Sequence, residues 1–524
     1  MEPRATLASL LSGIDARCTG DADIEITGIA YDSRHVAPGD VFVAVPGFVH
    51  DGLRFVADAV AAGAVAVIAQ DGPEAAALPS PPAAWARVAD ARRILAPVAA
   101  RFYGDPSEQL TVIGITGTNG KTTTTALLDR ILATRGPTGR WSTTTVSVAG
   151  SSRPAHRTTP EGPDLQAALR EMVDAGCWAA AIEVSSHALA LHRVDGTRFV
   201  AGVFTNLSGD HLDFHKDMDE YLDAKAMLFE RLEPDGIAVL NVGDPVAAEL
   251  AARTRARVVG YGWLERPGHK TYLDASTYWI RDWAYLDNGS RLRLATPGRE
   301  LELETPLFGP ANALNLAAAV ATAMELGLSD EQIIAPVAAF QGARGRFQRV
   351  NEGQPFAVLV DFAHTPAALQ AALAAARALA GDRQVIVVFG AGGDRDRGKR
   401  PAMGRIAAEA ADQVLVTSDN PRSEDPEAII DEIVAGMPSG ATAQIKRAVD
   451  RRRAIEHALE RARPGDCVLI AGKGHEREQI FADRTIPFDD VAVATEWLRE
   501  RYPRRADGSL QTPAPAGGDN GRTR

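Results

Sequence analysis

A glycine-containing segment, Gly114–Thr123 (GITGTNGKTT), follows an apolar run and precedes a stretch of helical character. Backbone N–H groups in such a turn point inward, and the N-terminus of the following helix adds positive potential, so the segment is suited to hold phosphate. Lys121 would reach the terminal phosphates, and the Thr122 hydroxyl would be a ligand for Mg²⁺. The strict pattern G-x-x-x-x-G-K-[ST] requires glycine where this chain has Ile115, so the sequence predicts a variant phosphate loop; the alternative is a simple strand–helix turn.

Two further polar side chains follow predicted strands in the same region. Glu183 ends the strand expected at Ala179–Val184, and His211 lies in the loop after the strand expected at Val200–Thr205. A lone Glu or His is more often solvated or structural than functional. Because the carboxyl ends of parallel strands meet at one edge of a sheet, we expect both side chains to lie near the phosphate loop, where they would suit a metal ion.

A third group of polar residues, Asp419-Asn-Pro-Arg422, follows the strand expected at Gln413–Thr417. A guanidinium fork at the ligand-facing edge of a sheet is suited to bind a carboxylate. On spacing alone, a βα turn with a helix N-cap explains these residues equally well.

Length and turn chemistry predict three domains and a tail. The chain has 524 residues, enough for about three domains of roughly 150 residues each. Turn-forming residues at Tyr103–Glu108 and Gln341–Arg346 mark two boundaries, and the segment after Tyr502 has almost no large apolar residue. We therefore expect domains over residues 1–105, 106–342 and 343–503, and a disordered tail over residues 504–524.

The pattern of apolar runs predicts an α/β fold in all three regions. In the first we expect strands at Ile24–Tyr31, Asp40–Val45 and Ala64–Ala69, a helix at Leu53–Ala62 and a surface loop at Gly72–Ala84. In the second, a mostly parallel sheet covered by helices is expected from strands at Leu110–Ile115, Ala179–Val184, Val200–Thr205 and Ile237–Asn241. In the third, a Rossmann-like doubly wound pattern is expected from strands at Ala357–Asp361, Gln384–Phe389, Gln413–Thr417 and Cys467–Ala471, with helices at Pro366–Leu379 and Asp450–Arg461.

Composition and charge exclude several protein classes. The formal net charge of −12 argues against a general binder of nucleic acid or anionic membranes. No apolar run approaches the length of a membrane span, and the N-terminus carries no convincing signal peptide. The three cysteines are far apart and odd in number, which argues against a disulfide framework or zinc site and fits a reducing compartment.

The phosphate loop, read as GTNGKTT, resembles the signature of the Mur ligase family, and the resemblance extends over roughly residues 25–500. The further matching motifs, in chain order, are Glu183-Val-Ser-Ser-His187, Thr205-Asn-Leu-Ser-Gly-Asp-His-Leu-Asp213, Ala224-Lys225, Asn312-Ala-Leu-Asn315, Gly345-Arg346, Asp361-Phe-Ala-His-Thr-Pro366, Gly392-Gly-Asp-Arg-Asp396, Asp419-Asn-Pro-Arg422 and Gly472-Lys-Gly-His-Glu476. The resemblance implies a uridine-nucleotide domain, a central ATPase and a C-terminal Rossmann-like domain.

The resemblance also implies roles for individual residues. For catalysis it implies Lys121, Glu183, His211 and Lys225, the last as a carbamate that joins Thr122, Glu183 and His211 around the metal. For ATP it implies Gly117, Thr118, Asn119, Gly120, Lys121, Thr122, Thr123, Asn312, Arg346 and Asp361. For the uridine-linked substrate it implies Tyr31, Ser33, His50, Thr158, Thr159, Ser185 and Arg193. For the incoming amino acid it implies Arg395, Asp419, Asn420, Pro421, Arg422, Gly472 and Glu476.

From the residues alone, Lys225 is one lysine on an amphipathic helix expected at Tyr221–Leu232 and would be solvated. Asn312 would often only cap or hydrogen-bond locally. Three positions depart from the family pattern: Arg157 stands where Asn is usual, Leu191 where Gln is usual and Gly209 where a basic residue is common. The first two put the neighbouring substrate contacts in doubt.

The activity that the resemblance implies is ATP-dependent formation of an amide bond, through an acyl phosphate and with Mg²⁺, in the synthesis of cell-wall peptidoglycan. The substrates would be small molecules: ATP, a UDP-linked muramoyl-L-Ala-D-Glu and meso-diaminopimelate, whose distal carboxylate Arg422 would bind. A cytoplasmic and monomeric enzyme is expected. The alternatives are a lysine-adding or other sibling ligase, a folylpolyglutamate synthetase, which would lack the first region, and a P-loop nucleotide switch. An oxidoreductase is disfavoured because no G-x-G-x-x-G follows the first strand of the third region.

Overall fold

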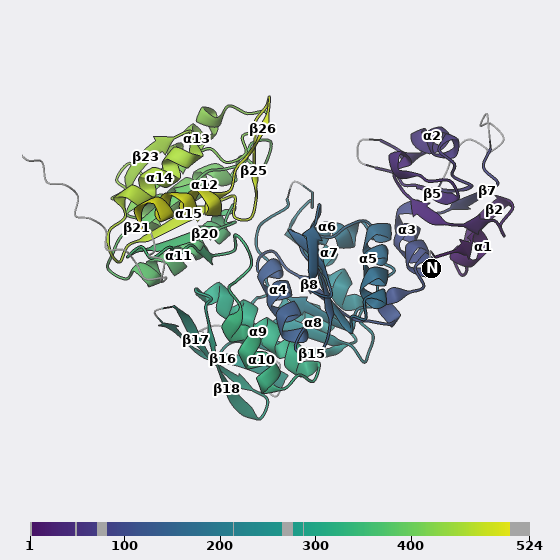
Figure 1. The fold of residues 1–524 in the computed structure, drawn as a ribbon, viewed down its shortest axis with the longest axis horizontal. Helices are drawn as coiled ribbons and strands as arrows, with labels where there is room; N and C mark the ends of the chain where they lie inside the picture. The colour runs from purple at the N-terminus through teal and green to yellow at the C-terminus, as the bar shows by residue number, and fades with distance from the viewer. Residues whose placement is uncertain are drawn as a thin grey trace, which may run out of the picture.

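The computed structural model describes residues 3–47, 50–70, 81–212, 214–264, 276–286 and 288–502. These residues form three large sheets of five, eleven and six strands, each covered by helices. Figure 1 shows the sheets in chain order, from the N-terminal sheet at the right, through the central sheet, to the C-terminal sheet at the upper left. The predicted α/β class with three domains is confirmed. The predicted tail and most of the predicted loop at Gly72–Ala84 lie outside the described residues.

The N-terminal sheet has the order β2-β7-β6-β5-β4, with β2 antiparallel and the other strands parallel. Its strands are β2 (Ala16–Gly20), β4 (Gly28–Ala30), β5 (Asp40–Ala44), β6 (Ala66–Ala69) and β7 (Ala84–Val88). A small pair, β1 (Ala5–Thr6) with β3 (Glu25–Ile26), lies apart from it. The helices are α1 (Leu7–Leu10), α2 (Val56–Ala61) and α3 (Ala91–Phe102), with 3-10 turns at Ser33–His35 and Gly52–Phe55.

Two predictions for this domain are wrong in detail. The strand expected at Ile24–Tyr31 is two strands in different sheets, because the backbone N–H of Thr27 turns away to donate to the Gly39 carbonyl. Gly28 then approaches β5 so closely that a Cβ would lie 2.2 Å from Asp40 Oδ1. The helix expected at Leu53–Ala62 begins as a 3-10 turn, since the Asp51 side chain caps the chain at Leu53.

The central sheet has the order β11-β10-β9-β12-β8-β13-β14-β15-β16-β17-β18. The four strands that the sequence predicts form its parallel middle: β8 (Thr111–Thr116), β12 (Ala179–Glu183), β13 (Ala201–Phe204) and β14 (Ile237–Asn241). The remaining strands are β9 (Thr138–Trp141), β10 (Thr145–Val148), β11 (Ser151–Pro154), β15 (Arg257–Trp263), β16 (Thr277–Leu286), β17 (Gly289–Thr296) and β18 (Arg299–Thr305). Both edges are antiparallel, at β9–β10–β11 and at β16–β17–β18, so the sheet is mostly parallel only in its middle.

Helices cover both faces of the central sheet, each over its own apolar core. One face carries α4 (Lys121–Leu132), α9 (Pro310–Glu325) and α10 (Asp330–Ala339), and the other carries α5 (Gly162–Asp174), α6 (Ser186–Ala190), α7 (Met218–Glu230) and α8 (Ala247–Arg253). With both faces buried, the middle strands read as continuous apolar runs, which is why the sequence reveals them.

The C-terminal sheet has the order β19-β20-β24-β21-β22-β23 and is parallel except for β19. Its strands are β19 (Gln348–Arg349), β20 (Ala357–Asp361), β21 (Val385–Phe389), β22 (Gln413–Thr417), β23 (Gln444–Ala448) and β24 (Cys467–Ala471). The helices α11 (Pro366–Ala380), α12 (Lys399–Ala410) and α13 (Pro426–Ala435) cover one face, and α14 (Arg451–Arg461) and α15 (Asp490–Arg501) the other. A hairpin, β25 (Glu478–Ile480) with β26 (Thr485–Pro487), follows β24.

The segment from Phe340 to Phe347 joins the central and C-terminal sheets and docks on the turn after β24. Gly345 has φ +64°, and a Cβ there would lie 2.1 Å from the backbone of Gly474 and His475. The His475 ring packs against Phe362, with 4.7 Å between ring centroids. Burial, with Arg346 and other cations nearby, lowers the pKa of His475 to about 3. The linker therefore depends on a neutral histidine.

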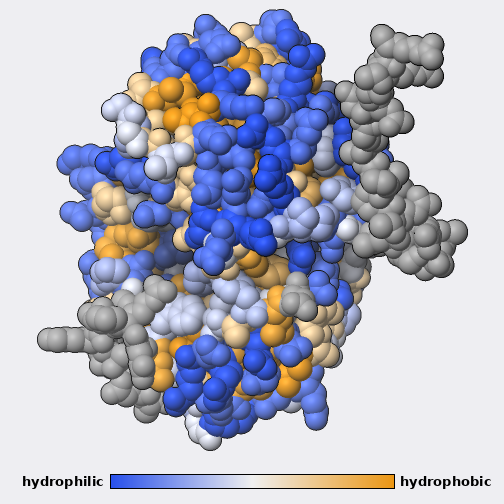
Figure 2. Space-filling view, turned by 90° about the vertical axis from the view of Figure 1, so that its left-hand side faces the viewer, coloured by the Kyte–Doolittle hydropathy of each residue, from blue (hydrophilic) through white to orange (hydrophobic). Residues whose placement is uncertain are grey.

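None of the described helices is long and apolar enough to cross a membrane. Figure 2 shows hydrophilic residues over most of the face that it presents, with apolar residues in small scattered groups.

The buried pair of Arg451 and Asp490 gives a stability prediction. Both side chains are 0% exposed, and the guanidinium donates to both carboxylate oxygens, at 2.8 and 2.7 Å. Arg451→Ala leaves an unpaired buried carboxylate, so we expect the C-terminal domain to lose about 3–5 kcal/mol of stability. Denaturant unfolding followed by tryptophan fluorescence measures this. Arg452→Ala, which breaks a surface pair with Glu496, is the matched control and should cost about 0–1 kcal/mol.

The depressed pKa of His475 predicts a loss of stability in acid. A histidine in the unfolded chain titrates near about 6.5. Below that pH the unfolded chain binds a proton that the folded chain excludes, so stability is complete above about pH 6.5 and falls as the pH drops towards about 3. In His475→Gln, the urea midpoint should fall less between about pH 7 and about pH 5 than in the parent. His156→Gln changes an exposed histidine and should behave as the parent does; equal acid sensitivity of all three proteins would contradict the prediction.

Candidate active site

The predicted phosphate loop lies between β8 and α4, as the sequence indicates. Gly117 and Gly120 have φ of +142° and +88°, and a Cβ on Gly117 would lie 1.9 Å from Thr205 Oγ1. Side chains and carbonyls of the segment after β13 hold the loop: Asn119 N–H donates to Asn206 Oδ1 at 3.0 Å. Lys121 Nζ donates to the carbonyls of Gly117 and Thr118, and burial lowers the pKa of this lysine. The buried ammonium group of Lys121 is thus held against the backbone of the loop.

Glu183 ends β12 directly beside this loop and is 0% exposed. Its carboxylate accepts hydrogen bonds from the Thr122 hydroxyl at 3.1 Å, the Thr143 N–H at 2.9 Å and the Thr143 hydroxyl at 3.1 Å. These hydrogen-bond donors are all neutral, although the charges of Lys121 and Arg346 lie near enough to interact with the carboxylate. A buried carboxylate with neutral hydrogen-bond donors, next to a phosphate loop, fits a divalent cation.

The remaining predicted metal ligands lie close by but do not form a preassembled cluster. His211 follows β13 with φ +55° and lines the same cavity as Glu183. Lys225 lies on α7, is 1% exposed, and has its Nζ 4.2 Å from the centroid of the Tyr221 ring. Among the described residues, no group of three or more His, Cys, Asp and Glu side chains is arranged to bind a metal. Phosphate oxygens and a modified Lys225 would have to complete the ligand set.

Lys225 is not the solvated lysine that its position on an amphipathic helix suggests. The amphipathic pattern misleads because α7 is buried on the face that meets the phosphate loop. Burial, and then the nearby charge of Lys121, hold the pKa of Lys225 well below its usual range. A neutral amine is the form that reacts with carbon dioxide, so this environment favours carbamylation.

A cavity of about 630 Å³ connects the phosphate loop with the residues that the sequence assigns to substrate. The predicted residues that line it are Thr118, Asn119, Gly120, Lys121, Thr122, Thr123, Thr158, Thr159, Glu183, Ser185, Arg193, His211, Arg346 and Arg395. We refer to it as the nucleotide cavity. The structure therefore brings most of the predicted catalytic and ATP-binding residues together.

Two of the predicted ATP-binding residues lie behind the wall of this cavity. Asn312 is buried in α9, where its amide donates to the Phe308 carbonyl and accepts from Asn315. Asp361 accepts from the Phe347 N–H, and burial raises its pKa although Arg346 is near. Arg346 itself stacks over Phe362, at 4.5 Å, and lines the cavity.

A second cavity, of about 820 Å³, lies beyond the carboxyl ends of the C-terminal strands. It is lined by Arg395, Asp419, Asn420, Arg422, Gly472 and Glu476, which the sequence assigns to the incoming amino acid, whereas Pro421 packs against Gly393 instead. We refer to it as the amino-acid cavity. Both cavities are lined by Asp210, His211, Phe362, His364 and Arg395, so they meet at these residues.

The amino-acid cavity has an anionic side and a cationic side. Lys473 is 0% exposed and binds Asn420 Oδ1 at 2.9 Å and Glu476 Oε2 at 3.0 Å. Asn420 Nδ2 also donates to Glu476 Oε2. Arg422 Nη1 donates to the Gly393 carbonyl at 2.6 Å, which fixes the guanidinium at the edge of the cavity. A ligand with both ammonium and carboxylate groups suits this arrangement.

Arg193, which the resemblance places near the anionic substrate, is already paired with Glu161, at 3.0 Å. The same carboxylate binds Arg157 at 3.0 Å and Arg92, on α3 of the N-terminal domain, at 2.9 Å. The departure from the family pattern at Arg157 is thus an added cation in this cluster. Three guanidinium groups around one carboxylate leave an excess of positive charge beside Thr158 and Thr159.

The predicted residues Tyr31, Ser33 and His50 do not line either cavity, although Tyr31 lies near Arg157 and Arg193 of the nucleotide cavity. Tyr31 donates its hydroxyl to Asp164 of α5, at 2.6 Å, and so ties the N-terminal domain to the central one. Ser33 lies in a 3-10 turn and His50 lies 3.3 Å from Arg54; neither lines the nucleotide or the amino-acid cavity in the described part of the chain. Phe48 and Val49, which precede His50, lie outside the described residues.

Sequence reasoning missed several residues of the site. Asp210 lines both cavities; although burial opposes it, His211 and His364 together lower the pKa of this carboxyl. Asp210 and Lys473 lie inside the motifs Thr205–Asp213 and Gly472–Glu476, so the sequence could have identified them as residues of the site. Lys399, which lines the amino-acid cavity, and Thr143, which donates to Glu183, lie outside all of the motifs, and no sequence signal identifies them.

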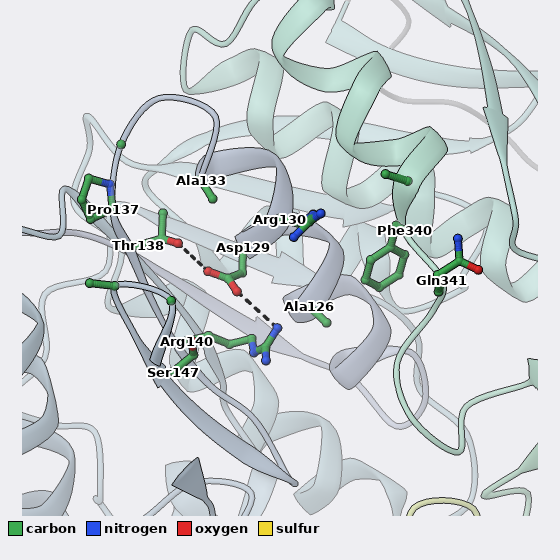
Figure 3. Close-up of a pocket in the computed structure, with 14 residues that line it drawn as sticks. Ala126, Asp129, Arg130, Ala133, Pro137, Thr138, Arg140, Ser147, Phe340 and Gln341 are labelled. Atoms are coloured by element: carbon green, nitrogen blue, oxygen red, sulfur yellow. Dashed lines mark hydrogen bonds and ion pairs between the residues drawn. The ribbon is translucent and has the colours of Figure 1, made fainter. Parts of the chain in front are cut away.

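A further cavity of about 630 Å³ lies at the opposite end of α4 from the phosphate loop, between that helix, β9 and the start of the linker at Phe340 (Figure 3). Its carboxylate, Asp129, accepts from the Thr138 hydroxyl at 2.6 Å and pairs with Arg140 at 3.2 Å. It is therefore separate from the candidate active site.

The comparisons with known proteins agree with this geometry. Three parts of the chain match family profiles: residues 25–103 "Mur ligase family, catalytic domain", residues 115–323 "Mur ligase middle domain" and residues 345–474 "Mur ligase, glutamate ligase domain". The chain is 46% identical to a UDP-N-acetylmuramoyl-L-alanyl-D-glutamate–2,6-diaminopimelate ligase of Solibacter usitatus, over 91% of this chain and 94% of the relative. It is 45% identical to the enzyme of that name from Gloeobacter violaceus, over 96% and 100%.

A solved structure of a ligase of the same name superimposes with a TM-score of 0.67 at 30% identity, covering 95% of this chain and 99% of that one. The likeness thus includes all three domains and the motifs that line both cavities. On the strength of these matches over nearly its whole length, the chain belongs to the Mur ligase family of ATP-dependent amide ligases.

Proposed function

We propose that this chain joins meso-2,6-diaminopimelate to the γ-carboxyl of D-Glu in UDP-N-acetylmuramoyl-L-Ala-D-Glu, with ATP, in the synthesis of peptidoglycan precursors. The observation that carries the proposal is the meeting of the nucleotide and amino-acid cavities at Asp210, His211 and Arg395. A phosphorylated carboxyl group in the first cavity and an amine in the second would come together there. The names of the similar enzymes support the same reaction.

The proposed chemistry has two steps. First, an oxygen of the D-Glu γ-carboxylate forms a bond to the γ-phosphorus of ATP, and the bond from that phosphorus to ADP breaks. Second, the amine nitrogen forms a bond to the acyl carbon and loses a proton, and phosphate leaves with the electron pair of its C–O bond. Both steps bring anions together, so the cations Lys121 and Arg346 at the nucleotide cavity would lower the barrier.

The residues around Glu183 would hold Mg²⁺. Bound Mg²⁺ would neutralise charge on the phosphates, with Thr122, Glu183, His211 and the carbamate of Lys225 as its protein ligands. The buried carboxylate with only neutral donors supports this set.

The two sides of the amino-acid cavity fit the two ends of diaminopimelate. We assign the distal carboxylate to Arg422 and Arg395, and the distal ammonium to Glu476, Asp419 and the Gly472 carbonyl. L-lysine has no distal carboxylate and would leave the arginines of the cavity unpaired. The positive cluster of Arg92, Arg157 and Arg193 around Glu161 supports binding of the anionic muramoyl dipeptide at the opposite end of the nucleotide cavity.

We assign residues 1–105 to the uridine nucleotide, 106–342 to ATP and 343–503 to the amino acid. Tyr31, Ser33 and His50 belong to the first assignment; none of them lines the nucleotide or the amino-acid cavity, and Tyr31 lies near Arg157 and Arg193, so a uridine group held there would lie beside the nucleotide cavity. Because the substrates are soluble nucleotides and amino acids, we expect the enzyme to act in the cytoplasm and as a monomer, without nucleic-acid or membrane partners.

The choice of amino acid can be tested directly. Purified protein with ATP and UDP-muramoyl-L-Ala-D-Glu should form product with meso-diaminopimelate, and much less with L-lysine, as measured by mass spectrometry. In Arg422→Ala the KM for diaminopimelate should rise about 10- to 100-fold, because charge-assisted hydrogen bonds are lost. Arg405→Ala, an exposed arginine on α12, should leave the KM unchanged. Product with lysine alone would overturn the assignment of Arg422, and ATP turnover without product would favour a sibling ligase or a nucleotide switch.

The proposed role of Lys225 as a carbamate ligand of the metal can be tested by substitution. Lys225→Ala should lower kcat by about 100-fold or more, since the metal loses a ligand, and short carboxylates such as acetate should restore part of the activity. Lys225→Arg should be as impaired but not restored, because the arginine fills the space and forms no carbamate. Lys216→Ala, on an exposed lysine before the same helix, is the control. Full activity of Lys225→Arg would exclude the carbamate.

A further inference from the structure

The two arginines of the amino-acid cavity lie on separate loops that are packed backbone to backbone. Arg395 lies on the loop after β21, and Arg422 lies on the loop after β22. Gly393 N–H donates to the Asn420 carbonyl at 2.9 Å, and Arg422 Nη1 donates to the Gly393 carbonyl at 2.6 Å. A Cβ on Gly393 would lie 1.8 Å from the Pro421 carbonyl oxygen, so only glycine permits this approach. The position of each arginine therefore depends on the other loop.

A third arginine, Arg400, forms hydrogen bonds to both loops. It lies in the first turn of α12, is 0% exposed and does not line the cavity. Its Nη2 donates to the Gly392 carbonyl of the first loop at 3.1 Å and to Glu424 Oε1 of the second at 2.8 Å. Its Nη1 donates to Glu424 Oε2 at 2.9 Å and to Glu432 of α13 at 2.8 Å. Only a planar fork reaches all of these acceptors at once.

Glu424 extends this connection back to the first loop. Its Oε1 accepts from the Asp394 N–H at 2.7 Å, and the Asp394 carboxylate accepts from the Ser423 hydroxyl at 2.6 Å and N–H at 3.1 Å. Asp394 and Arg422 both have φ of +52°, a conformation that L-residues rarely adopt and that surrounding contacts must stabilise. The hydrogen bonds through Arg400 and Glu424 supply such contacts on both loops.

We propose that Arg400 is a positioning residue for the incoming amino acid, and that through Gly392 and Glu424 it sets the separation of Arg395 and Arg422 and thereby the selection of diaminopimelate over lysine. This inference rests on the proposed function. Arg400 touches neither cavity, so it acts on the ligand only through the two loops. The separation of two guanidinium groups decides whether both can bind one carboxylate, because N–H···O hydrogen bonds form over donor–acceptor distances of only about 2.7–3.2 Å.

The charges of this connection persist over the pH range in which enzymes work. The hydrogen bonds from Arg400 lower the pKa of Glu424 to about 2, so the carboxylate stays ionised in mild acid. The titratable and charged groups that face it are Arg400, Asp394, Arg397 and Glu432. The ratio of kcat/KM for diaminopimelate over lysine should therefore be the same in mildly acidic and alkaline buffer. If Glu424 or Arg400 changed its charge over this range, the ratio would change.

The test uses the full-length protein with ATP and UDP-muramoyl-L-Ala-D-Glu, and measures kcat and KM for meso-diaminopimelate and L-lysine. In Arg400→Lys and Glu424→Gln we expect the KM for diaminopimelate to rise about tenfold or more, while the KM values for ATP and the UDP-linked substrate stay within about twofold. The ratio of kcat/KM for diaminopimelate over lysine should fall by a similar factor. Glu409→Gln, on an exposed glutamate of α12 outside this connection, is the matched control and should keep the parent's KM and ratio.

A double substitution separates positioning from general damage. Because Arg400 acts through Arg422, the effects of Arg400→Lys and Arg422→Ala on diaminopimelate should be less than additive. Additive effects, or an unchanged KM in a folded Arg400→Lys protein, would overturn the inference. If the variants of Arg400 and Glu424 fail to fold, Ser423→Ala removes one exposed bond of the connection and should still raise the KM about threefold; no change there would overturn it too. Absence of product in the parent protein would instead overturn the proposed function.

Discussion

The two cavities of the site meet at one carboxylate, that of Asp210, which lines both of them. Asp210 belongs to the central domain, yet its charge is felt by His364 and Lys399 of the C-terminal domain as well as by Lys121 of the phosphate loop. The loop after β13 thus extends the central sheet's ligand-binding edge to that of the C-terminal sheet. In open α/β sheets, ligands bind beyond the carboxyl ends of the strands. Where these ends of two sheets face one cavity each and the cavities meet, two ligands can react with each other.

Around this junction the protein keeps its cations poorly solvated. Burial lowers the pKa of Lys121, Lys225 and Arg346, which means that each of these charges is destabilised by its surroundings. An anionic ligand such as a nucleotide relieves that penalty when it binds, because its phosphates replace the missing water. For Lys225 the same penalty favours a different outcome, conversion of the cation into a carbamate. Burial therefore prepares phosphate binding and lysine modification in one place.

The sequence predicts the parts of the site whose signals are local. The phosphate loop is recognisable because the glycines, Lys121 and Thr122 follow one another, and β8 reads as an apolar run because helices cover both of its faces. The antiparallel edge at β16 to β18 escaped the sequence analysis although it carries a usable signal: β18 alternates polar and apolar residues, a pattern that predicts a half-buried strand. The break at Thr27 escapes prediction too, because its cause is a bond to Gly39, far along the chain.

The same distinction holds for single residues of the site. Arg400 and Thr143 each have a key partner that is distant in sequence, Glu424 at 24 residues and Glu183 at 40 residues, and the neighbouring residues do not identify those partners. Lys225 is misread because periodicity does not reveal that the side of α7 carrying Tyr221 and Lys225 is buried against the phosphate loop, where the Tyr221 hydroxyl lies 3.1 Å from Thr118 Oγ1. Local spacing identifies residues that touch a ligand, whereas tertiary packing decides which residues hold them.

The cluster around Glu161 shows how a departure from a family pattern can be accommodated by charge. Arg157 replaces a usual asparagine, and a neutral amide there could only have hydrogen-bonded to its neighbours. As an arginine it shares Glu161 with Arg92 and Arg193, whose guanidinium groups come from α3 and from the segment after α6. Glu161 alone cannot neutralise all three cations, and Arg157 is half exposed, so the cluster keeps a positive charge that solvent can reach. A cluster of this kind beside Thr158 and Thr159 favours an anionic ligand over a neutral one.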